Sequence, residues 1–116
     1  MSIQIQAHGF ELSEPLEQYT LARIRKGLGR RLDRVSKLRV GLSDINGPKG
    51  GADKRCQIHI ALPRRKDVVV EEVQEDMYGA IDSAMRRARQ TLGRRLSKQR
   101  VRKQPKHGLN TIESET

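Results

Sequence analysis

The segment from Asp76 to Lys98 confines its apolar residues to one helical stripe, and this feature restricts the possible folds more than any other. The apolar residues recur at the spacing of about 3.6 residues that a helix requires: Met77, Ile81, Ala84, Met85, Ala88, Leu92 and Leu96. They cover roughly a third of the helix circumference, which is typical of a helix that packs on a sheet. Asp76 is placed to act as the N-cap. Arg95 falls inside the apolar stripe, so we expect the helix to extend past the core near its end.

Four other segments have the composition of β-strands, and three of them alternate between apolar and polar residues. The predicted strands span residues 2–8, 37–45, 54–62 and 68–73. In the third strand, the alternation directs Cys56 toward the core, as a buried and inert thiol, and His59 toward the opposite side. The valines of the fourth strand do not alternate cleanly, so the side that this strand buries stays open.

Another helix is predicted over residues 14–31. Ser13 has the side chain of an N-cap, and an acidic residue and a proline follow it, as is common in a first helical turn. Gly27 and Gly29 each cost about 1 kcal/mol relative to alanine inside a helix. We therefore expect a bend, fraying or a small insertion near the end of this helix.

The resulting order β-α-β-β-β-α predicts an α+β fold in which a four-stranded sheet carries two helices on one face, similar to a double-stranded-RNA-binding domain. Hydrophobic residues make up 34% and charged residues 33% of the 116 residues, so the core must be thin. We expect one domain over residues 1–100. Residues 101–116 are expected to form a flexible tail that is first basic and then weakly acidic.

Several classes of protein are excluded by what the sequence lacks. No segment has the run of about 20 apolar residues that a membrane span needs, and the N-terminus lacks the basic and apolar regions of a signal peptide. A single cysteine excludes an intramolecular disulfide and a cysteine-based zinc cluster. We therefore expect a cytoplasmic protein with no membrane association, no metal and no cofactor.

Positive charge is abundant and unevenly distributed. Lys and Arg number 24 against 14 Asp and Glu, which gives a net charge of +10 and favours polyanionic partners. Residues 23–39 carry eight basic residues and one acidic residue, and residues 86–106 carry ten basic residues and no acidic residue. Both segments include predicted helices on one sheet face, so we expect one broad electropositive ridge. Residues 100–106 can equally be read as a nonspecific basic tail.

Three short motifs carry a resemblance to a known family. They are EDMYGAID at residues 75–82, IQI at residues 3–5 and LSEPL at residues 12–16. Through these motifs, the element order and the charge placement, residues 2–100 resemble the short form of the ribosome hibernation-promoting factors. This family is also known as the ribosome-associated inhibitors or the sigma-54 modulation proteins.

The resemblance implies a cytoplasmic bacterial protein that is not an enzyme and that is monomeric when free. Its partners would be the small ribosomal subunit and the whole ribosome. It would bind 16S rRNA in the channel used by mRNA and tRNA, inhibit translation and stabilise idle ribosomes, as part of a stress response. By position, the resemblance carries RNA contacts to Arg87, Arg94 and Lys98 in one helix and to Arg23 and Lys26 in the other. The full set of expected RNA-binding residues is Arg23, Lys26, Arg30, Arg86, Arg87, Arg89, Arg94 and Lys98.

The sequence departs from the family pattern at several places. Gln90 stands where the family has a basic residue, so that contact is either lost or taken over by Arg89. An extra residue near Gly27 leaves the correspondence of Arg30 and Arg31 open. The loop over residues 46–53 is longer and richer in glycine, and we expect it to be mobile. The C-terminal dimerisation domain of long members is absent, so pairing of ribosomes through such a domain is not expected.

Other functions remain as alternatives. A generic double-stranded-RNA-binding protein shares the α-β-β-β-α order and basic helices. An enzyme would require a site at Cys56 and His59, which the alternation places on opposite sheet faces. Tyr78 can stack on a base, although packing against the sheet is the simpler interpretation. The glycines around Lys49 lack the order of a phosphate-binding loop and do not open a helix, so that interpretation is rejected.

Overall fold

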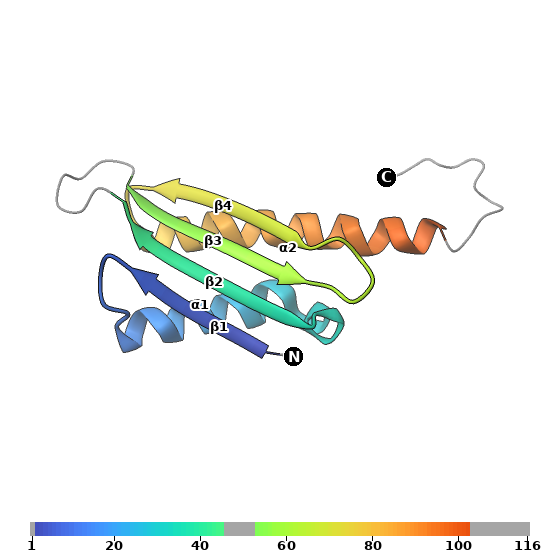
Figure 1. The fold of residues 1–116 in the computed structure, drawn as a ribbon, viewed down its shortest axis with the longest axis horizontal. Coiled ribbons are helices and arrows are strands. Elements are labelled where there is room, and N and C mark those ends of the chain that lie inside the picture. The colour runs from blue at the N-terminus through green and yellow to red at the C-terminus, as the bar shows by residue number, and fades with distance from the viewer. Residues whose placement is uncertain (1, 46–52, 103–116) are drawn as a thin grey trace.

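The computed structural model of this chain describes residues 2–45 and 53–102, with side chains described through Ser97. Its elements are β1 (Ser2–His8), α1 (Glu14–Leu28), the 3-10 helix η1 (Gly29–Arg34), β2 (Lys37–Asp44), β3 (Lys54–Ala61), β4 (Val68–Gln74) and α2 (Met77–Arg102) (Figure 1). The predicted order β-α-β-β-β-α is confirmed. The predictions of a mobile loop and a flexible tail fall largely on residues 46–52 and 103–116, outside the described residues.

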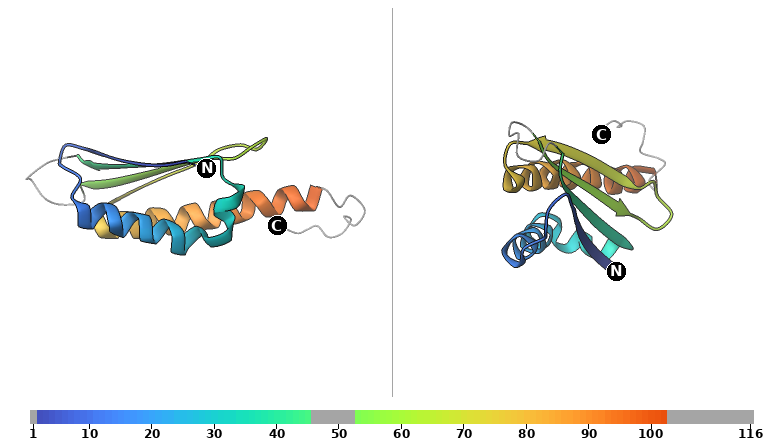
Figure 2. Two further views of the ribbon diagram at one scale, coloured as in Figure 1. Left: turned by 90° about the horizontal axis from the view of Figure 1, so that it is seen from below. Right: turned by 60° about the vertical axis from the view of Figure 1, so that its left-hand side comes forward.

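The four strands form one mixed sheet in the order β1-β2-β3-β4, and both helices cover the same face of it (Figure 2). β1 pairs with β2 in parallel, with Ile3 opposite Leu38, whereas the β2–β3 and β3–β4 pairs are antiparallel. A parallel pair needs a crossover connection, which α1 supplies between β1 and β2. No element of the described chain covers the opposite sheet face, so that face is open to solvent.

The core lies between the covered sheet face and the two helices. Strand alternation directs Val40 and Ile58 inward, where both are buried. The predicted stripe of α2 is also buried, apart from Met77 at its start, and comprises Ile81, Ala84, Met85, Ala88, Leu92 and Leu96. In β4, Val68 and Val70 are buried and Val69 is 55% exposed, which settles the side that this strand buries.

Both predicted N-caps are confirmed. The Ser13 hydroxyl accepts a hydrogen bond from the backbone N–H of Leu16 at 3.3 Å. The Asp76 carboxylate accepts one from the backbone N–H of Gly79 at 3.0 Å. Each cap satisfies a backbone donor that the first helical turn leaves without a partner, and this fixes where α1 and α2 begin.

The end of α1 is irregular, as its glycines predict. The α-helix ends at Leu28 and continues as η1, so the predicted helix end at residue 31 is wrong. Gly29 adopts a φ of 51°, in the region that favours glycine. At Gly27, an added Cβ would lie 2.9 Å from Cγ of Met85, so the missing side chain lets α1 approach α2 closely.

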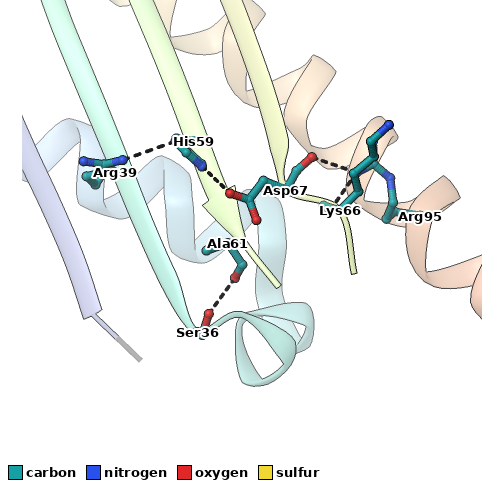
Figure 3. A network of polar contacts seen from close by, with 7 residues as sticks. All are labelled: Ser36, Arg39, His59, Ala61, Lys66, Asp67 and Arg95. Carbon is teal, nitrogen blue, oxygen red and sulfur yellow. Dashed lines mark hydrogen bonds and ion pairs between the residues drawn. The ribbon is translucent and has the colours of Figure 1, made fainter. Parts of the chain in front are cut away.

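Arg95, which interrupts the apolar stripe of α2, has a specific partner that the sequence did not indicate. Its Nη1 donates to the carbonyl oxygens of Lys66 and Asp67, each at 2.7 Å (Figure 3). The next residue, Leu96, is the last buried residue of α2 among the described side chains, and the helix continues to Arg102, so it does extend past the core as expected. Arg95 itself attaches α2 to the turn between β3 and β4.

Candidate nucleic-acid interface

The two helices lie side by side and run in the same direction (Figure 2). Asp82 of α2 joins them: its Oδ1 accepts a hydrogen bond from the Tyr19 hydroxyl at 2.7 Å and lies 3.1 Å from Nε of Arg23, as an ion pair without hydrogen-bond alignment. The hydrogen bond to Asp82 raises the pKa of Tyr19. Tyr78 packs edge-on against Tyr19, with ring centroids 4.8 Å apart, so its predicted packing against the sheet is wrong.

Farther along the helices, arginine side chains of α2 and η1 converge on one shallow depression. This depression has a volume of about 390 Å³, and its lining residues are Arg31, Arg86, Arg89, Gln90, Gly93 and Arg94. Its four arginines are called the arginine cluster below. The Arg31 guanidinium lies over Gly93, where an added Cβ would be 3.4 Å from Nη2. The absence of a side chain at Gly93 thus provides room for a cation from η1 on the surface of α2.

Helical geometry explains why the α2 members of the arginine cluster face the same way. Arg86, Arg89 and Gly93 follow one another at spacings of three and four residues, which places them on one side of a helix. Arg94 flanks that side. The apolar stripe holds the opposite side of α2 against the sheet, so the arginines necessarily face outward.

The arginine cluster keeps its full positive charge. Within the described part of the chain, none of its four members forms an ion pair or hydrogen bond with a carboxylate, and no acidic residue lines the depression. Guanidinium groups gathered without counter-charges repel one another, and a bound anion relieves this repulsion. Each guanidinium is also a planar fork that can hold a phosphate through two hydrogen bonds. The site is therefore suited to a chain of phosphates.

The other expected RNA-binding residues lie outside the arginine cluster. Arg87 donates to the Glu72 carboxylate at 2.7 Å and to a β4 carbonyl, so its charge is partly neutralised on the strand side of α2. Arg23 is paired with Asp82, as described above. Lys26 and Arg30 are exposed on α1 and η1. Lys98 belongs to α2, but its side chain lies outside the described residues.

The structure adds Arg31 to the set of candidate residues. The sequence contained two signals for it, of which the first is the glycine pair at Gly27 and Gly29 that predicts an irregular helix end. The direction that the chain takes after α1 depends on the change from α1 to η1, and no local sequence pattern specifies that change. Gly93 was a second signal, since a glycine inside a long helix often marks a close approach by another group.

Neither a thiol-based site nor a metal centre is supported by the described residues. The Cys56 side chain is fully buried on the covered sheet face, and burial raises the pKa of its thiol to about 12. His59 lies on the open face, so the two residues do lie on opposite faces, as the alternation predicts. Within residues 2–45 and 53–102, no three His, Cys, Asp or Glu side chains could jointly hold a metal ion, and no helix is long and apolar enough to cross a bilayer.

Together, the fold and the surface define a class of protein: a small, basic α+β domain with one open sheet face and a cationic helical face. Residues 3–100 match the family described as sigma 54 modulation protein / S30EA ribosomal protein, and the chain belongs to this family. No curated protein sequence is similar enough to count as a match.

Two solved structures are similar to this one. The structure of a ribosomal subunit interface protein from Coxiella burnetii is 23% identical, covers 84% of this chain and 99% of its own, and has a TM-score of 0.71. At this identity, the similarity shows a shared fold. The Protein Y N-terminal domain of Thermus thermophilus is 26% identical, covers 81% of this chain and 98% of its own, and has a TM-score of 0.66. The predicted family and fold are thereby confirmed.

Proposed function

We propose that this cytoplasmic protein binds the small ribosomal subunit through 16S rRNA, occupies the channel of mRNA and tRNA, and thereby stabilises idle ribosomes. The observation that carries the proposal is the arginine cluster, a set of guanidinium groups from two elements that lacks carboxylate partners within the described chain. The chain belongs to a family whose description names a ribosomal protein, and this supports ribosomal RNA as the source of the phosphates that the arginine cluster would bind.

The proposed mechanism requires no chemical step. Guanidinium groups bind backbone phosphates and release condensed counterions, so affinity depends steeply on salt. Folded RNA is recognised largely by its shape and its backbone, so base stacking on aromatic side chains is not required. This suits a surface on which the two tyrosine rings, Tyr19 and Tyr78, pack against each other. A bound domain then excludes mRNA and tRNA because two bodies cannot occupy the same channel. The free protein is proposed to be monomeric.

Cosedimentation with ribosomal subunits tests this proposal. The test variant carries Arg89→Glu and Arg94→Glu in the arginine cluster. The control carries Arg64→Glu and Lys66→Glu, which change the net charge equally at two exposed positions of the turn between β3 and β4. We expect the test variant to lose most of its binding and the control to keep it. The slope of log K against log salt should also fall by about 1 for each lost phosphate contact.

Two results would contradict the proposal. Equal losses in both variants would show that net charge alone governs binding, and the arginine cluster would not be the site. Competition by plain duplex RNA as strong as that by ribosomes would favour a generic double-stranded-RNA-binding protein instead.

A further inference from the structure

The open sheet face is hollow at its centre. Gly41 lies in the middle of β2, and no heavy atom of any described residue other than Gly41 and its two chain neighbours lies within 4 Å of where its Cβ would be. In register on either side stand Gln6 of β1 and Gln57 of β3. The hollow that results has a volume of about 410 Å³, and its rim also includes Arg39 and Arg55. We call it the sheet hollow.

Donor groups and positive charge dominate the sheet hollow. Among the residues that the structure describes, no carboxylate belongs to its lining, which includes two arginines, two histidines and three glutamines. Arg55 lies 3.6 Å from Glu71, a residue outside the lining. Arg39 donates to Nδ1 of His59 at 3.3 Å rather than to a carboxylate, so it keeps its charge.

A polar network holds Arg39 at the rim of the sheet hollow (Figure 3). Nδ1 of His59 accepts from Arg39, which places the proton of the neutral ring on Nε2. Nε2 lies 2.7 Å from Oδ2 of Asp67, and the Asp67 carbonyl accepts from Arg95 of α2. The Arg39 guanidinium is therefore positioned by a chain of contacts that reaches through β3 and the turn between β3 and β4 to α2.

We propose that the sheet hollow binds a second segment of RNA, so that the domain contacts RNA through both of its faces. This inference rests on the proposed function. Arginine at the rim matches phosphate, and the glutamine amides both donate and accept, as base edges and ribose 2′-hydroxyls require. The exposed apolar residues of this face, Val69 and Val73, lie on β4 outside the lining, so an apolar protein partner would find little to bury in the hollow.

The relative position of the two sites supports the proposal. The arginine cluster lies on the helical face, and the sheet hollow lies on the opposite face. A domain that fills a channel with RNA walls meets RNA on two sides at once. Two cationic depressions on opposite faces, with no carboxylate among their described lining residues, fit this situation better than a single one-sided contact does.

Gly41→Leu tests the sheet hollow without removing any charge. The new side chain enters open space, and leucine is better suited to a strand than glycine, so the fold should persist with an unchanged or higher unfolding midpoint. We expect ribosome binding to weaken about tenfold, as for the loss of one charge-assisted contact. Ala61→Leu, on the same face but outside the lining, is the matched control and should bind normally.

A tethered probe gives a second, independent measurement. Ser43→Cys in the sheet hollow and Gln90→Cys at the arginine cluster each accept a hydroxyl-radical-generating reagent, which the buried Cys56 cannot react with. We expect both probes to cleave 16S rRNA, at different nucleotides. Cleavage from position 90 alone, together with normal binding by Gly41→Leu, would overturn the inference. Failure of the unmodified protein to bind ribosomes would instead overturn the proposed function.

Discussion

Two glycines inside helices should respond in opposite ways to the same substitution. Gly27 of α1 packs against Met85, with only 2.9 Å between Cγ of Met85 and the site of an added Cβ. Gly93 of α2 faces the Arg31 guanidinium at 3.4 Å, which is the mobile end of an exposed side chain. Gly93→Ala therefore meets a group that can move aside, whereas Gly27→Ala meets a side chain held in the core.

The magnitudes follow from two opposing terms. Alanine is more favourable than glycine inside a helix by up to about 1 kcal/mol at either site. Inserting an atom into a packed core costs about 1–3 kcal/mol. Gly93→Ala should raise the free energy of unfolding by up to about 1 kcal/mol, because it makes only the first contribution. Gly27→Ala gains the helix propensity of alanine but also inserts an atom into the packed core. It should therefore lower the free energy of unfolding by about 0–2 kcal/mol.

Urea unfolding of both variants measures these changes directly. A double-mutant cycle with Met85→Ala isolates the contact, because Gly27→Ala should become favourable once the methionine is gone. Equal stabilisation by Gly27→Ala and Gly93→Ala would refute the argument that Gly27 is present to let the helices approach.

Three further changes test other contacts. Burial raises the pKa of Cys56 from 9.0 to about 12, so stability of at most about 4 kcal/mol, present below pH 9, should be lost between pH 9 and 12. Cys56→Ala should flatten this decline in alkaline unfolding curves. Asp82→Ala removes the acceptor of the Tyr19 hydroxyl, so the pKa of Tyr19 should fall toward its ordinary value in a spectrophotometric titration. Asp76→Ala removes the α2 N-cap and should lower the free energy of unfolding by about 1 kcal/mol in urea.

Each of these changes has a result that would contradict its reasoning. An equally steep alkaline decline in Cys56→Ala would place the titrating group elsewhere. A Tyr19 pKa that stays raised in Asp82→Ala would mean that the carboxylate is not its cause. Asp76→Asn retains a capping oxygen, so a loss of stability equal to that of Asp76→Ala would exclude the capping explanation.

The fold could be predicted because its elements are specified by local patterns. Ile58 shows this in β3, where period-two alternation alone identified the buried side. β4 resisted the same reasoning, because apolar residues occupy both of its sides and Val69 is exposed on the open face. The parallel pairing of β1 with β2 was not predicted, because a helix between two strands permits the crossover that a parallel pair requires but does not specify which strand β1 pairs with.

The candidate site could be predicted only in part, because it depends on contacts between distant segments. Arg86 and Arg89 share one side of α2, which helical spacing already indicates. Arg31 reaches them only because η1 begins at Gly29 and places the Arg31 guanidinium over Gly93 of α2. Arg87 differs from its neighbours through a partner in β4, and no spacing within α2 could indicate that pairing.

The placement of β1 has a consequence for local unfolding. β1 pairs on one side only, and its partner β2 comes after all of α1 and η1, so its pairing is the most distant in sequence of any in the sheet. Its inward residues Ile3 and Ile5 are only partly buried. β1 should therefore detach before the β2–β3–β4 meander does and show the fastest amide hydrogen exchange of the four strands. Since Gln6 leaves with it, the sheet hollow would lose one wall in an opening that leaves the arginine cluster intact.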